Sequence, residues 1–326
     1  MEMDRRWFLA CIAATPFAAR LAHAQGERIR IVGFLSAAAE PGRRHRDFRD
    51  DLQKLGWVDG KNVRIEFRYG AGNAERLAAL ADELVKLKAD VIVGQGTPSV
   101  AALKNATREI PIVMGMAADP LASGFVTNLA RPGGNITGLS MMMGELAGKR
   151  LELMRDWLPK LTRVAFLGYG PDPAHRNFVE QTQAAGRKLG MQVQVVIVQK
   201  ADELERAFDE MAREKAEGVV VQPLFANTLG MGPRIAELAV KHRLPSISDG
   251  GGFADQGGLL YYGPDVRTMN PRVAPYVDRI LRGAKPGDLP IEQPQKFEFV
   301  VNLKTARAIG AEPPRGMLLK VDRFVE

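Results

Sequence analysis

The sequence predicts an α/β protein with two doubly wound parallel-sheet, Rossmann-like domains joined by a hinge. Three observations predict this fold class. Short apolar strands alternate with amphipathic helices, and the order of elements in the first half recurs in the second. The chain of 326 residues also exceeds the usual size of one hydrophobic core.

The first half predicts strands and helices in strict alternation. Residues 63–67 alternate with period two, and the wholly apolar run Asp90–Gly94 is typical of a buried parallel strand. Gly56 ends the first helix. The expected strands are 29–35, 63–67, 90–94 and 110–114, and the expected helices are 44–55, 74–88 and 98–107.

The second half repeats this order. Residues 218–221 correspond to 90–93, residues 244–248 correspond to 110–113, and Gly190 ends a helix as Gly56 does. The expected strands are 164–167, 193–198, 218–221 and 244–248, and the expected helices are 175–189, 204–213 and 235–242. Two domains of the same βαβαβ topology explain this repeated order of strands and helices.

Right-handed crossovers bring the carboxyl ends of parallel strands to one edge of each sheet, where ligands bind. Two such edges facing each other form an interdomain cleft. Residues 136–140 read as a strand crossing to the second domain, and Gly263–Thr268 as a return crossing. The expected lobes are 25–139 plus about 268–285, and 140–267 plus about 286–326.

The first 24 residues read as a cleaved signal peptide. Arg5 and Arg6 precede an apolar run over residues 7–19, and Ala22-His23-Ala24 supplies a small-residue cleavage site. Arg5-Arg6-Trp7-Phe8-Leu9 also matches the twin-arginine pattern, which predicts export by that route. Removal of residues 1–24 leaves a net charge of +6 and no cysteine, because Cys11 lies in the leader.

The mature chain lacks the usual signatures of a catalytic or metal site, so we expect no enzyme, no metal and no cofactor. His45, His175 and His242 are far apart in sequence, with no carboxylates at metal-ligand spacing, and no G-x-S-x-G motif occurs. Gly94-Gln95-Gly96 lacks the third glycine of a dinucleotide fingerprint. Basic residues alternate with acidic ones, so we expect no nucleic-acid partner.

Candidate ligand contacts lie at predicted strand ends. Gly96, Thr97, Pro98 and Ser99 follow a strand and open a helix, with Thr97 as the expected N-cap; free N–H groups there suit a carboxylate. The full set of expected ligand-binding residues is Phe34, Ser36, Gly96, Thr97, Pro98, Ser99, Asp119, Tyr169, Phe225, Asp249 and Phe253.

Several of these candidates also have plain structural readings. Asp249 precedes three glycines and either meets a ligand ammonium or forms an Asp-Gly turn. Asp119 either contacts ligand or caps a helix that begins at Pro120. Phe34 is either part of an aromatic clamp or a core residue, whereas Tyr169 and Phe253 stand among glycines.

A series of short motifs spans nearly the whole mature chain. They are residues 55–63, 89–93 with 96–98, 110–113, 119–120, 129–138, 257–260, 289–294 and 297–305. In this order they resemble the ABC-transporter substrate-binding proteins of the tryptophan/tyrosine-binding type, with the type I periplasmic binding protein fold. The sequence departs from the family pattern at residues 168–171 and 249–253.

This resemblance implies a monomeric periplasmic receptor that holds a small organic solute in its cleft and passes it to an ABC permease in the inner membrane. The solute would be an amino acid or another aromatic or simple carboxylate. A sensor protein that feeds a signalling receptor, and an exported enzyme, remain as alternative functions.

Overall fold

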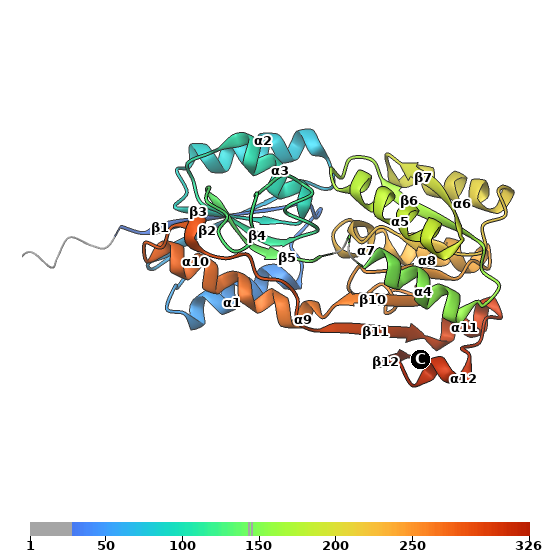
Figure 1. Ribbon diagram of the computed structural model, residues 1–326. Helices are drawn as coiled ribbons and strands as arrows, with labels where there is room; N and C mark the ends of the chain where they lie inside the picture. The colour runs from blue at the N-terminus through green and yellow to red at the C-terminus, as the bar shows by residue number, and fades with distance from the viewer. Residues whose placement is uncertain (1–27, 143, 145) are drawn as a thin grey trace, which may run out of the picture.

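The computed structural model describes residues 28–142, 144 and 146–326, so the predicted leader and its export route lie outside the described residues. Two lobes stand side by side, and each has a central sheet covered by helices on both faces (Figure 1). Strand ladders in both lobes are dominated by parallel pairs, which confirms the predicted α/β fold class.

The first lobe is built on a five-stranded sheet of order β2-β1-β3-β4-β5, and every pair in it is parallel. Helices α2 and α3 pack together on one face, while α1 packs against α10 on the other. Its elements are β1 Arg30–Ser36, α1 Arg43–Lys54, β2 Val63–Tyr69, α2 Ala74–Lys86, β3 Val91–Gln95, α3 Thr97–Ala106, β4 Ile112–Ala117, β5 Ile136–Ser140, α9 Val266–Met269 and α10 Val273–Leu281.

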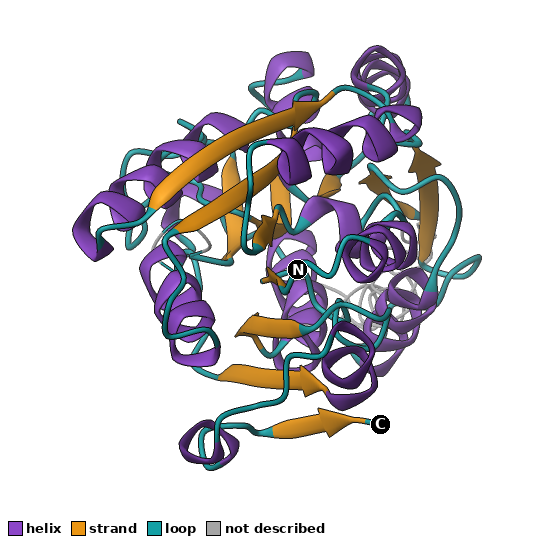
Figure 2. Ribbon diagram, turned by 90° about the vertical axis from the view of Figure 1, so that its right-hand side faces the viewer, coloured by secondary structure: helices purple, strands orange, loops and turns teal. Residues whose placement is uncertain are grey.

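The second lobe has a seven-stranded sheet of order β12-β11-β10-β9-β8-β6-β7. Its C-terminal strand lies at the edge of that sheet (Figure 2). Its elements are α4 Ala147–Trp157, β6 Arg163–Tyr169, α5 His175–Leu189, β7 Gln192–Val198, α6 Leu204–Arg213, β8 Val219–Val221, α7 Leu224–Asn227, α8 Gly232–Lys241, β9 Ser246–Ser248, β10 Leu260–Pro264, β11 Phe297–Asn302, α11 Leu303–Ile309, α12 Arg315–Leu318 and β12 Arg323–Val325.

The second sheet contains one antiparallel pair of strands that the sequence did not predict. Strand β11 runs antiparallel to β10 because the chain re-enters this lobe from the first one. Strand β12 then pairs parallel with β11. The two lobes therefore share a parallel core but differ at the edge where the chain ends.

Strand β5 begins the first crossing between the lobes, and Gly138 fits there because it has no side chain. Its φ is 123°, and a Cβ atom would stand 2.5 Å from the backbone N and O atoms of Met114. The register between β4 and β5 shifts between Met114 and Ala117. The extra residue lies in β4, so the bulge bends β4 beside the crossing strand.

The third crossing lies later than the predicted boundary at about residue 286. The Ile291 N–H donates to the Leu129 carbonyl at 2.7 Å, and the Ser140 N–H donates to the Glu292 carbonyl at 2.9 Å. Residues 286–292 therefore stay with the first lobe, because their backbone groups pair with β5 and its neighbours. The chain crosses for the last time between Glu292 and Phe297.

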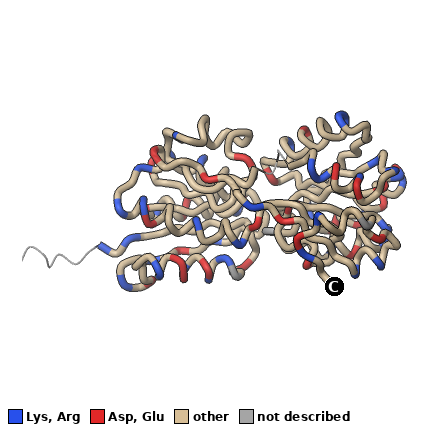
Figure 3. The backbone as a smooth tube through the Cα atoms, turned by 60° about the horizontal axis from the view of Figure 1, so that its bottom comes forward, with Lys and Arg blue, Asp and Glu red and all other residues tan. Residues whose placement is uncertain are grey.

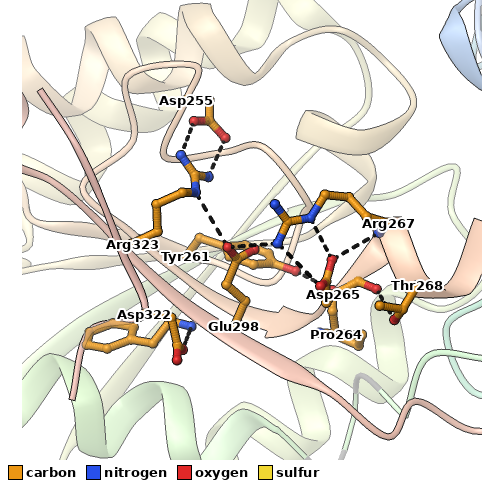
Figure 4. A network of polar contacts seen from close by, with 10 residues as sticks. Asp255, Tyr261, Pro264, Asp265, Arg267, Thr268, Glu298, Asp322 and Arg323 are labelled. Carbon is orange, nitrogen blue, oxygen red and sulfur yellow. Dashed lines mark hydrogen bonds and ion pairs between the residues drawn. The ribbon is translucent and has the colours of Figure 1, made fainter.

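Charged residues of both signs are interspersed over both lobes (Figure 3). One polar network lies beside the second crossing, where Arg267 of α9 and Arg323 of β12 both reach Glu298 of β11 (Figure 4). Arg323 also pairs with both carboxylate oxygens of Asp255, at 2.7 and 2.9 Å.

Within the described ranges, no helix combines the length and the apolarity needed to cross a bilayer.

Candidate functional site

The carboxyl edges of the two sheets face each other across a small cavity of about 40 Å³. An adjoining space of about 230 Å³ shares Arg44, Gln95 and Thr228 with it. The cavity is lined from the first lobe by Arg44, Gln95, Gly96, Thr97, Met116 and Ala118, from the crossing by Met141, and from the second lobe by Asp172, Phe178, Pro223, Leu224 and Thr228. Because its walls come from both lobes, the cavity lies in the cleft between them.

Helix α3 points its N-terminus at this cavity. The sequence predicted Thr97 as N-cap, but Gly96 takes that position with φ 81° and ψ 161°. Only glycine adopts this backbone region readily, so the helix starts one residue earlier than predicted. The Thr97 hydroxyl oxygen instead accepts the Ala118 N–H at 3.0 Å, which ties the end of β4 to the start of α3.

Two of the four residues predicted in this loop line the cavity. These are Gly96 and Thr97, whereas Pro98 and Ser99 lie behind them in the first turn. No side chain caps the N-terminus of α3. The positive end of its helix dipole, formed by the first N–H groups, therefore faces the cavity. The buried Ser99 hydroxyl has no hydrogen-bond partner among the described residues.

Arg44 brings a positive charge to the same cavity from the first turn of α1. Its side chain lines both the cavity and the adjoining space. It makes no hydrogen bond or ion pair with any residue that the structure describes. Burial lowers the pKa of the Arg44 guanidinium from its ordinary value, although arginine stays charged at neutral pH. Among the described residues, the cavity therefore holds a cation without a counter-ion.

Asp172 faces the cavity from the second lobe. One carboxylate oxygen accepts the Ala174 N–H at 3.0 Å and the other accepts the Gln222 side-chain amide at 2.6 Å. The Gln222 oxygen in turn accepts the Tyr169 N–H, which fixes its orientation. Burial raises the pKa of Asp172 to about 6 despite these hydrogen bonds and the charge of His175. No cationic side chain pairs with this carboxylate among the described residues.

Asp249 has a different role from the one predicted. Its carboxylate forms an ion pair with Arg150 of α4, and both side chains are 1% exposed. Arg150 approaches from 99 positions earlier in the chain, which sequence spacing could not reveal. Asp249 is not among the residues that line the cavity, and its carboxylate is already paired.

The predicted aromatic contacts belong mostly to the cores of the lobes. Phe34 packs edge-on against His45 with ring centroids 5.0 Å apart, and it is 2% exposed. Phe225 and Phe253 are fully buried in the core of the second lobe. Tyr169 packs against Phe225, and its hydroxyl reaches the Gly72 carbonyl of the first lobe at 3.4 Å.

The two remaining candidates lie at the margin of the cleft. Ser36 lines the adjoining space, and its hydroxyl oxygen accepts the Ala38 N–H at 3.2 Å. Asp119 accepts the N–H groups of Leu121 and Ala122, but it caps a turn and no helix follows. Asp119 does not line the cavity, because its carboxylate turns back onto its own backbone.

Sequence reasoning missed the two charged residues that line the cavity. Arg44 stands in the run Arg43-Arg44-His45-Arg46 and so looks like part of a solvated helix face. Its position one loop after β1 was the available signal, because that loop opens on the carboxyl edge of the sheet. Asp172 follows Gly168-Tyr169-Gly170-Pro171, a segment that departs from the family pattern.

The cavity combines a cation and a helix N-terminus on one wall with a carboxylate on the other. Phe178, Leu224 and Met116 supply apolar surface between them. Such a site suits a small molecule with an anionic group, a donor or ammonium group and an apolar body. Among the residues described, no group of three or more His, Cys, Asp or Glu side chains could hold a metal ion.

Residues 29–323 match the family described as ABC transporter substrate binding protein. The chain belongs to this family. A curated relative, the tyrosine-binding protein of Clostridioides difficile (strain R20291), is 25% identical over 258 residues, which are 79% of this chain and 74% of the relative. The family members that resemble this chain are substrate-binding proteins and not enzymes.

Solved structures share the fold of this substrate-binding protein. A Streptococcus pneumonia ABC domain in complex with L-Trp superposes with a TM-score of 0.82 at 24% identity, covering 91% of this chain and 99% of that one. A ligand-free, open substrate binding protein from Clostridium difficile gives a TM-score of 0.64 at 24% identity, with coverage of 91% and 99%. Both likenesses support two α/β lobes around a cleft.

Proposed function

We propose that this substrate-binding protein is exported to the periplasm, where it captures an amino acid or an aromatic carboxylate and delivers it to an ABC permease in the inner membrane. The observation that carries the proposal is Arg44. A half-buried guanidinium without a counter-ion is costly, and the chain offers it no carboxylate among the described residues. A ligand carboxylate supplies the missing charge when it enters the cleft.

The opposite wall favours an amino acid over a simple acid. Asp172 accepts two hydrogen bonds from neutral donors and has no cationic partner among the described residues. A ligand ammonium group would pair with it, while Gly96 and Thr97 at the start of α3 would assist Arg44 with the carboxylate. Among relatives, one is named for tyrosine binding and one was solved with L-Trp, which supports this class of ligand.

Calorimetry of the purified protein tests the proposal. L-tyrosine, L-tryptophan and benzoate are titrated into the parent protein, Arg44→Met and Arg46→Met. Arg46 is an exposed arginine of the same helix, so its loss controls for a change in net charge. Binding that only Arg44→Met weakens supports the site. No binding of any of these compounds, or turnover of a bound one, would contradict the proposed function.

Export requires a separate experiment, because residues 1–27 lie outside the described part of the chain. Replacement of Arg5-Arg6 by Lys-Lys is expected to block or slow secretion if the twin-arginine route carries the protein. Unchanged periplasmic yield in a strain without that pathway would assign export to the general secretory route. An entirely cytoplasmic product would contradict the periplasmic role.

A further inference from the structure

The two lobes also touch outside the cavity, at the turn that follows β2. Gly72 of this turn lies against Leu229 of the second lobe, which follows α7. The Tyr169 hydroxyl of β6 donates to the Gly72 carbonyl at 3.4 Å. All three residues are held by their own lobe, so their contact forms only when the cleft is closed.

Gly72 is held rigidly in position on the first lobe. Its N–H donates to the Ala37 carbonyl at 2.8 Å, and the Gly70 N–H donates to the Ser36 carbonyl at 2.8 Å. Ser36 and Ala38 line the space that adjoins the cavity. The turn is therefore bonded to one wall of the ligand cleft.

Leu229 is held as firmly on the second lobe. It packs against the core cluster that contains Tyr169 and Phe225, and its N–H donates to the Leu224 carbonyl at 3.1 Å. Leu224 and Thr228 line the cavity itself. The segment 224–229 thus supplies both the cavity wall and the contact with Gly72.

Glycine is required at position 72 for two reasons. Its φ of 71° is a conformation that other residues adopt at a cost. A Cβ atom there would stand 2.7 Å from a Leu229 methyl carbon and 3.4 Å from the Tyr169 hydroxyl, so a side chain at this position would press on the contact between the lobes. The positive φ concerns the turn alone, whereas the contact with Leu229 and Tyr169 concerns closure of the lobes.

We propose that Gly72, Leu229 and Tyr169 form a closure clasp that holds the lobes together around the ligand without touching it. This inference rests on the proposed function, because it assigns these residues to the open–closed equilibrium of the same cleft. A ligand that binds the closed form has an apparent affinity proportional to the closed population. Weakening the clasp therefore lowers affinity for every ligand by the same factor.

The test compares Gly72→Ala with Gly60→Ala. Gly60 also has a positive φ, 83°, in an exposed turn before β2, but a Cβ atom there would meet nothing within 4 Å. The control carries the same backbone strain without the contact. We expect Gly72→Ala to weaken L-tyrosine binding by about tenfold or more through faster dissociation, and Gly60→Ala to change it by less than about threefold.

A second variant separates the clasp from damage to the turn. Leu229→Ala removes the methyl carbons that the new Cβ atom would strike, so the double variant Gly72→Ala/Leu229→Ala should regain part of the lost affinity. The ratio of L-tyrosine to L-tryptophan affinity should stay constant in all variants. Equal effects of Gly72→Ala and Gly60→Ala, no recovery in the double variant, or a changed ratio would each overturn the clasp.

Small-angle scattering of the ligand-free proteins distinguishes failure of the clasp from failure of the proposed function. If the parent protein binds neither amino acid, the proposed ligand class is wrong, and scattering alone then decides the clasp. We expect a larger radius of gyration for Gly72→Ala than for the parent and Gly60→Ala. Equal radii in that case overturn the clasp.

Discussion

Each lobe has an arginine near the cleft, half-buried in the first and fully buried in the second, and the two have opposite environments. Arg150 of the second lobe is neutralised by Asp249, with both side chains 1% exposed. Arg44 of the first lobe has no such partner among the described residues and lines the cavity. A charge that is paired within the chain serves the fold, whereas the charge without a partner among the described residues is the one that we propose binds a ligand.

The same contrast applies to the acidic residues of the second lobe. Asp249 is committed to an ion pair, whereas Asp172 accepts hydrogen bonds only from neutral donors. Both stand after strands at the carboxyl edge of one sheet, so their position does not distinguish them. Their partners distinguish them, because only Asp172 lacks a cationic partner among the described residues.

The largest expected effect is on the paired arginine. Arg150→Met leaves the Asp249 carboxylate buried without its cation, so we expect unfolding free energy to fall by about 3–5 kcal/mol. Denaturant titration measures it. The double variant Arg150→Met/Asp249→Leu should recover much of this loss, because it leaves no uncompensated charge. A single variant as stable as the parent would contradict the structural role of this pair.

The unpaired arginine should behave in the opposite way. Arg44→Met is expected to lower affinity for a carboxylate ligand by about 10- to 150-fold, which corresponds to about 1.5–3 kcal/mol for a hydrogen bond to a charged group. The stability of the ligand-free protein should not fall, since no partner in the described chain loses a charge. Calorimetry and thermal unfolding on the same samples measure both quantities. A large loss of stability would show that Arg44 serves the fold instead.

The pH dependence of binding should sharpen the distinction between the two acids. Burial raises the pKa of Asp172 to about 6, so below that pH the free protein holds a proton that an ammonium ligand must displace. Affinity for an amino acid should fall about tenfold per pH unit below about pH 6 and stay constant above about pH 7. Benzoate has no ammonium group and should not show this fall between pH 7 and pH 5.5. A flat profile for both ligands would remove Asp172 from the site.

The same raised pKa predicts a cost to the fold. The unfolded chain ionises Asp172 near pH 4 and the folded chain near pH 6, so stability decreases as pH rises between these values. The full difference is roughly 3 kcal/mol, and it persists at neutral pH. Relative to the parent, Asp172→Asn should therefore gain stability as pH rises from about 4 to about 6. Denaturant midpoints at both pH values measure this change.

The smallest effect is expected from the surface network near the second crossing. Arg267 is 67% exposed and pairs with Asp265 and Glu298, so solvent screens its interactions. Arg267→Ala should change the unfolding free energy by less than about 1 kcal/mol. Thermal unfolding measures this small shift. A larger loss would mean that the network couples the hinge to the C-terminal strand.

Local patterns predicted the elements of the fold closely. Residues 175–189 form a helix that ends at Gly190 in the left-handed conformation, and residues 136–140 form the crossing strand, both as expected. These features depend on apolar periodicity and on glycine, which act within a few residues. Strand β11 was not predicted, because its direction depends on the return of the chain from the other lobe.

The site was less accessible to sequence reasoning. Gly96 and Thr97 line the cavity because a helix that follows a strand of a parallel sheet starts at the carboxyl edge. Asp249 has the same kind of position, but its pairing with a distant arginine decides its role. Arg44 could not be separated from its basic neighbours by residue type alone. The ion-pair and hydrogen-bond partners that a charged side chain finds in the fold, and not its position in the sequence, determine whether it remains available to a ligand.

The three crossings also have a consequence for the order in which the protein can be made. Helix α10 packs against α1 and the sheet of the first lobe, and strand β11 belongs to the sheet of the second. Both pieces come from residues 273–302, close to the end of the chain. A growing polypeptide therefore cannot finish its first lobe before most of the second has been synthesised. Loss of the last 60 or so residues by early termination would leave two incomplete hydrophobic cores instead of one intact lobe.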